Sequence, residues 1–168
     1  MVRKEPLLLE LETRSPGETE TLGTHLGRRL SQGDGLALVG ELGAGKTLFA
    51  RGVARGLGVE GAEEVSSPSY LLMVEYPGPV PFFHFDGYFA AKEESFLQEG
   101  GQVLLEGEGV ALVEWADKLE AWIPPGFLWV RILSFPGLPE VRRIRFSGDP
   151  RRWRKVLEEV EEEFPGEL

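Results

Sequence analysis

The chain has 168 residues and a formal net charge of −10, with 42% hydrophobic residues, 27% charged residues and no cysteine. This composition is typical of a soluble globular protein that buries a core without disulfides, and it excludes thiol chemistry. The negative charge argues against a wide nucleic-acid-binding face, because such a face must neutralise phosphates.

The apolar runs of the chain predict a cytoplasmic protein that makes no membrane contact. The N-terminal run consists of the three leucines at 7–9, which is too short for a signal peptide. No run approaches the roughly 18 to 20 apolar residues that span a bilayer. No repeat or low-complexity tract divides the chain, and we expect a single domain over residues 1–168.

The first elements expected along the chain are a strand at 6–12 and a helix after it. Ser15 stands where an N-cap is expected, and Pro16 follows at the first helical position. Leucines at four-residue spacing from Leu22 to Leu30 then form one apolar stripe on this helix.

The later elements alternate at first and then include several strands close together. In chain order we expect a strand at 35–39, a helix at 46–57, a hairpin of strands at 69–76 and 80–88, a helical stretch at 92–106 interrupted at Gly100-Gly101, strands at 110–115, 128–133 and 141–146, and a C-terminal helix at about 149–164. This order favours an α/β sandwich whose parallel core sheet is extended by antiparallel strands.

A glycine-rich loop between the strand at 35–39 and the helix at 46–57 predicts a phosphate-binding site. It reads Gly40-Glu41-Leu42-Gly43-Ala44-Gly45-Lys46-Thr47 and matches the pattern G-x-x-x-x-G-K-[ST] without deviation. Glycines let backbone N–H groups approach phosphate oxygens at the start of a helix. The Lys46 ammonium supplies a positive charge, and the Thr47 hydroxyl is a candidate magnesium ligand.

Two carboxylates are candidates for the rest of the site. Glu114 closes the expected strand at 110–115, and such strand ends face the ligand in parallel sheets. Asp86 ends the strand at 80–88, on the same side as His84 under two-residue alternation, and this is typical of a strand that borders a polar cleft. We expect Trp115, next to Glu114, to pack against other side chains and to take no part in the chemistry.

Ser67 and Ser69 lie in a turn and are either turn caps or contacts to a terminal phosphate.

Four segments in this order resemble the bacterial TsaE ATPases of tRNA threonylcarbamoyladenosine biosynthesis. They read "GELGAGKT", "SSPSY", "FHFDGY" and "LVEW", and the likeness covers roughly residues 15–133. It implies a P-loop NTPase-like three-layer sandwich that binds ATP or ADP with Mg²⁺. It also implies that the protein acts together with a threonylcarbamoyl transferase subunit and its paralogous partner protein, and that it meets tRNA indirectly through that complex. The ATPase cycle would reset the transferase.

The resemblance also implies roles for single residues. Gly43 to Thr47 match the phosphate loop, Glu114 the carboxylate on magnesium, and Asp86 a catalytic or metal-linked aspartate. Glu41, Leu42 and Leu48 beside the loop are further candidate contacts to the nucleotide. Thr19 matches a position near the base and sugar of the nucleotide. Three departures are Ser69 for threonine, Leu48 for a second threonine, and Phe89 for arginine.

Three alternative functions were compared with this one. A GTPase needs an Asn-Lys-x-Asp motif, which a chain without asparagine cannot supply. A small-molecule kinase would use the same loop with Asp86 as base, yet its expected arginine-bearing lid is missing because residues 66–129 contain no arginine. A nucleotide-dependent interaction module would bind ATP and turn it over negligibly alone.

The C-terminal helix carries its basic residues at its start and its glutamates at its end, against the preference of the helix dipole. One interpretation is a solvated face with Arg–Glu pairs one turn apart. The other is a basic patch over residues 151–155 that faces an acidic partner or tRNA.

Overall fold

A computed structural model describes residues 5–41, 43–66 and 72–164 of the chain. The strands are β1 (Leu7–Thr13), β2 (Gly35–Val39), β3 (Met73–Tyr76), β4 (Phe82–Asp86), β5 (Val110–Glu114), β6 (Leu128–Phe135) and β7 (Leu138–Ser147). The α-helices are α1 (Pro16–Gly27), α2 (Lys46–Gly56), α3 (Ala90–Gln98) and α4 (Pro150–Glu163), and the short 3₁₀ helices are η1 (Ala62–Glu64), η2 (Gly101–Leu105) and η3 (Ala116–Trp122).

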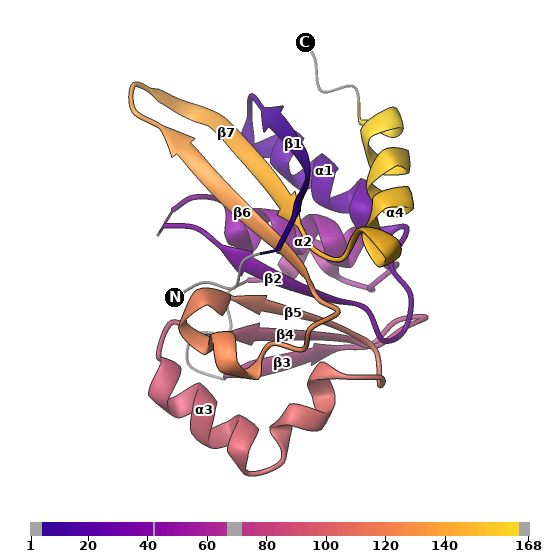
Figure 1. Cartoon of the computed structure of the whole chain (residues 1–168), viewed down its shortest axis with the longest axis vertical. Coiled ribbons are helices and arrows are strands. Elements are labelled where there is room, and N and C mark those ends of the chain that lie inside the picture. Colours follow the sequence, from indigo (N-terminus) through magenta and orange to yellow (C-terminus); the bar gives the residue numbers. More distant parts are fainter. Residues whose placement is uncertain (1–4, 42, 67–71, 165–168) are drawn as a thin grey trace.

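The strands form one seven-stranded sheet in the order β1-β7-β6-β2-β5-β4-β3 (Figure 1). β6, β2, β5 and β4 run parallel to their neighbours within this group. β7 and β1 at one end and β3 at the other are antiparallel additions. The predicted parallel core extended by antiparallel strands is therefore confirmed, as is the hairpin of β3 and β4.

The sheet is covered on both faces, and this makes three layers. Along β2, Leu36 and Leu38 join the core formed with α1, α2 and α4, while Ala37 and Val39 join a second core formed with α3, η2 and η3. All residues of β2, β4 and β5 are buried, as expected for parallel strands between two layers of helices. The strand that ends at Asp86 is therefore buried along its whole length.

Helices α1 and α2 pack backbone against backbone beside the glycine-rich loop at 40–47. The predicted cap of α1 is present, because Ser15 Oγ accepts from the Glu18 N–H at 3.1 Å. A Cβ added to Gly52 of α2 would lie 2.0 Å from the Glu20 carbonyl oxygen of α1, so only glycine permits this approach. The two helices therefore pack tightly beside the loop that precedes α2.

The C-terminal helix lies beside α1 (Figure 1), and its terminal acids contact that helix. Glu159 accepts from Arg29 Nε at 3.1 Å, and Glu163 accepts from Arg29 at 2.7 Å and bonds to His25 at 3.0 Å. The acids at the end of α4 thus pair with α1 and the residues just after it, and among the described residues no Arg–Glu pair joins one turn of α4 to the next. At the other end, Arg152 bonds to Asp34. Ion pairs with other segments therefore engage both ends of α4.

Within residues 5–41, 43–66 and 72–164, no helix combines the length and the apolar character that a membrane crossing requires.

Candidate functional site

The glycine loop connects the C-terminal end of β2 to the first residue of α2. Gly45 is the N-cap residue of α2 and has φ of +111°, a left-handed conformation that favours glycine. The Ala44 N–H donates to the Glu41 carbonyl at 3.0 Å, which closes a turn within the loop. The strand, the turn and the helix therefore follow one another in the order that a phosphate loop requires.

The Lys46 side chain is folded back over this loop. Its Nζ donates to the carbonyls of Gly40 at 2.6 Å and Glu41 at 2.9 Å, and it lies 4.0 Å from the centroid of the Trp115 ring. Burial lowers the pKa of Lys46, and the nearby carboxylates, Glu114 first among them, oppose this. Trp115 was expected only to pack, but its ring also provides one wall for the cation.

Glu114, the last residue of β5, contacts the start of α2. Its two carboxylate oxygens each lie 3.3 Å from Thr47 Oγ1, and the residue is 2% exposed. This proximity follows from the sheet order, because β5 pairs directly with β2 and brings Leu38 opposite Glu114. The structure thus brings together the hydroxyl and the carboxylate that the sequence suggested as metal ligands.

Asp86 ends the next parallel strand and is the register partner of Glu114. It is 3% exposed, and its Oδ1 accepts from the Tyr88 N–H at 2.9 Å. The backbone also joins the two strand ends, since the Gly87 N–H donates to the Glu114 carbonyl at 2.8 Å. Both candidate carboxylates therefore lie at one edge of the sheet, beside the glycine loop.

His84 is a site residue to which sequence reasoning assigned no role. The side chain is fully buried, and its Nε2 lies 2.7 Å from Glu114 Oε2. The two atoms are within hydrogen-bond distance, and toward an ionised carboxylate Nε2 is the donor, because that group can only accept. His84 pairs with the glutamate of the adjacent strand rather than with Asp86, and it holds one carboxylate oxygen while the group faces Thr47.

Thr19 and Leu48 lie on the other side of the loop. Both line a small cleft of about 50 Å³ together with residues 43–45 of the loop. The Thr19 hydroxyl is buried and lies 2.7 Å from the Thr13 hydroxyl, so it is already engaged with β1. The predictions for Leu42, Ser67 and Ser69 concern positions outside the described residues.

Arg142 of β7 is a second residue that sequence reasoning missed. It lines the same cleft as Thr19. Its guanidinium donates to the loop carbonyls of Ala44 at 2.7 Å and Gly43 at 3.3 Å. No local pattern could reveal this contact, since the partners are 98 and 99 residues apart.

The donors at this site fit a magnesium ion that is shared with phosphate. In the described part of the chain, no three histidine, aspartate or glutamate side chains gather into a group able to hold a metal alone. Mg²⁺ usually keeps several waters and binds one or two protein oxygens together with substrate phosphates. Thr47 and Glu114 supply those oxygens beside the glycine loop.

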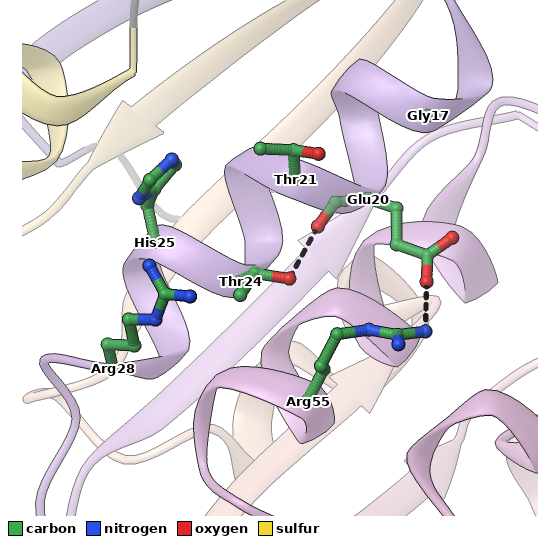
Figure 2. Close-up of a pocket in the computed structure, with 7 residues that line it drawn as sticks. All are labelled: Gly17, Glu20, Thr21, Thr24, His25, Arg28 and Arg55. Atoms are coloured by element: carbon green, nitrogen blue, oxygen red, sulfur yellow. Dashed lines mark hydrogen bonds and ion pairs between the residues drawn. The ribbon is translucent and has the colours of Figure 1, made fainter.

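A further hollow of about 400 Å³ lies over α1 and α2 (Figure 2). Arg55 lines it but donates to Glu20 at 2.7 Å, and His25 lines it but bonds to Glu163 at 3.0 Å. Both side chains are therefore already bonded to carboxylates. None of the glycine-loop residues lines this hollow, so it lies apart from the candidate site.

Comparisons with known proteins agree with this arrangement. The family model described as "Threonylcarbamoyl adenosine biosynthesis protein TsaE" matches residues 13–137. The tRNA threonylcarbamoyladenosine biosynthesis protein TsaE of Treponema pallidum is 38% identical over 112 residues, which are 67% of this chain and 82% of that protein. The Bacillus subtilis protein of the same name is 35% identical over 153 residues, or 90% of this chain and 93% of that one.

A solved structure shows the same fold. The crystal structure of Bacillus subtilis YdiB superposes with a TM-score of 0.74 and 29% sequence identity, covering 95% of this chain and 97% of that chain. The family match, the relatives and the P-loop arrangement at the ends of β2 and β5 all lead to one assignment. The chain belongs to the TsaE family of threonylcarbamoyl adenosine biosynthesis proteins.

Proposed function

We propose that the chain binds ATP and ADP at residues 41–48 and hydrolyses ATP with magnesium. The observation that carries this proposal is the contact of Thr47 Oγ1 with both oxygens of Glu114, directly at the start of the helix that follows the glycine loop. A hydroxyl and a carboxylate in this position are the two protein ligands that a nucleotide-bound magnesium ion uses in P-loop proteins. When bound, the ion would neutralise charge on the phosphate oxygens.

The residues of the chain then have distinct tasks. The loop N–H groups bind the phosphates, and Lys46 leaves the Gly40 and Glu41 carbonyls to neutralise phosphate charge. His84 donates to Glu114 and fixes the direction of its carboxylate. Asp86, at the end of the adjacent strand, orients the attacking water or accepts its proton.

We also propose a biological role for this cycle in the cytoplasm. The chain serves as an accessory subunit of the complex that forms threonylcarbamoyladenosine on tRNA, and its nucleotide cycle supports turnover of the transferase. Its partners are the threonylcarbamoyl transferase subunit and the paralogous partner protein, and tRNA reaches it only through the complex. Family membership supports this role, as do the printed names of the relatives from T. pallidum and B. subtilis.

The test is ATP hydrolysis by the purified chain, alone and with the transferase subunits. Glu114→Ala and Asp86→Ala should each abolish partner-stimulated turnover while nucleotide binding survives. Lys46→Ala should lose binding itself, because the positive charge and its place in the loop are both removed. The matched control is Lys118→Ala, since Lys118 is exposed and donates to the Tyr88 carbonyl outside the loop. Normal turnover by both carboxylate variants would contradict the assigned roles.

The same assay separates the alternative functions. A small-molecule kinase would release a phosphorylated metabolite from a substrate panel and would need no transferase. An interaction module would show ATP-dependent capture of the transferase subunits without stimulated hydrolysis. Stimulated hydrolysis with no phosphorylated product is the outcome expected here.

A further inference from the structure

The guanidinium of Arg142 links the β7 strand to the phosphate loop. Its Nε donates to the Ala44 carbonyl at 2.7 Å and one terminal nitrogen donates to the Gly43 carbonyl at 3.3 Å. The other terminal nitrogen donates to the carbonyls of Pro139 at 2.7 Å and Val141 at 2.9 Å. The side chain is thus held on its own strand while it holds two carbonyls of the loop. It also lies beyond the residues 13–137 that match the family model.

These contacts determine which way the loop peptides face. In a trans peptide the C=O and the N–H point in opposite directions. Arg142 draws the Ala44 carbonyl toward β7, so the Gly45 N–H of the same peptide points away from β7. The Gly43 carbonyl is drawn the same way, and the Ala44 N–H of that peptide closes the turn with Glu41 at 3.0 Å.

The loop needs such an external support because its glycines are permissive. Gly43 and Gly45 have φ of +81° and +111°, and a Cβ on Gly43 would meet open space. A glycine backbone reaches these conformations without strain but loses more freedom than any other residue when it is ordered. Hydrogen bonds from a side chain that is already fixed on a sheet reduce the number of conformations that the free loop samples.

We propose that Arg142 is a positioning residue that sets the Gly43–Gly45 backbone in its phosphate-binding conformation before the nucleotide arrives. This inference rests on the proposed nucleotide binding. Arginine suits the task because its planar fork donates in several directions at once, which a lysine ammonium on a flexible stem does less well. Preorganisation of this kind raises affinity because less ordering remains to be done on binding.

The neighbouring residue provides a matched control. Arg143 is exposed, pairs with Glu10 at 3.1 Å, and lies 5.0 Å from the centroid of the Phe135 ring. It has the same side chain on the same strand, but it makes no hydrogen bond or ion pair with the described residues of the loop. Arg142→Met keeps most of the apolar stem and removes every donor, while Arg142→Lys restores the charge without the fork.

The experiment measures the dissociation constant for ADP with magnesium by calorimetry, together with amide hydrogen exchange at Gly43 and Gly45 in the free protein. R142M should weaken ADP binding about tenfold, the loss expected for charge-assisted hydrogen bonds, and should speed exchange at both amides. R142K should recover part of the affinity. R143M should match the wild type in both measurements, and R142M should unfold at a similar temperature.

Two different failures are distinguishable. If the wild type binds ADP and R142M binds it equally well with unchanged exchange, the positioning role is wrong while nucleotide binding stands. If the wild type does not bind ADP or ATP, the proposed function itself fails, and the role of Arg142 fails with it. Should R142M not fold, R142K decides, because an ADP affinity equal to that of the wild type would contradict the need for the fork.

Discussion

Glu93 in α3 is a buried acid whose protonation should make the fold sensitive to pH. None of its surface is exposed, and among the described residues neither carboxylate oxygen has a hydrogen-bond partner. Burial, with a smaller contribution from the charge of Asp86, raises the pKa of Glu93 to about 8. The side chain is therefore a neutral acid in the folded protein at neutral pH, although it is ionised in the unfolded chain.

The direction and size of the effect follow from proton linkage. Because the pKa rises from 4.5 unfolded to about 8 folded, the native state binds more protons than the unfolded state between these values. The contribution of Glu93 to stability is fully present below pH 4.5 and is lost as the pH rises toward about 8. Each pH unit in this interval costs about 1.4 kcal/mol, so the loss from about pH 5 to about pH 7.5 is roughly 3 kcal/mol.

Glu93→Gln tests this by replacing the acid with a neutral side chain of the same shape. Urea unfolding of both proteins, repeated across this pH range, gives the difference in their free energies of unfolding. That difference should move in favour of the variant by roughly 3 kcal/mol as the pH rises. Glu94→Gln is the matched control, because Glu94 is the exposed neighbour on the same helix and should show no such trend. If the difference in the free energy of unfolding between E93Q and the wild type does not change with pH, Glu93 is not a buried neutral acid.

Three further predictions concern the site and its support. His84→Ala should lower partner-stimulated hydrolysis about tenfold or more, because Glu114 loses the donor that orients its carboxylate. The variant should still bind ADP, and turnover equal to that of the wild type would count against this role. Nucleotide titration should change the tryptophan fluorescence, since Lys46 leaves the Trp115 ring when the nucleotide binds. The change should vanish in W115F, and a change of the same size in W115F would show that it does not come from Trp115. Gly52→Ala should lower the free energy of unfolding in urea by about 1–3 kcal/mol, because the new Cβ meets the Glu20 carbonyl of α1. G17A is the control and should not lower it. A G52A variant as stable as the wild type would contradict the packing.

Part of the candidate site could be predicted from the sequence because it rests on local geometry. The loop over residues 40–47 needs only its own glycines, the strand before it and the helix after it, and all three are close in the chain. The ends of two buried strands likewise identified Glu114 and Asp86. The pairing of His84 with Glu114 could not be predicted, because it depends on the register between β4 and β5, and these strands are separated by α3 and η2.

The sequence alone determined the strands, the α-helices, the cap of α1 and the position of the glycine loop, since each of these depends mostly on hydrogen bonds and backbone angles within a few residues. The tertiary structure decided which side chains from distant segments meet. The strand order placed Glu114 beside Thr47, turned Lys46 onto Trp115, buried Glu93 and brought Arg142 to the loop carbonyls. Such contacts arise when whole faces are buried together, and many sequences with the same local pattern could satisfy that requirement in other ways.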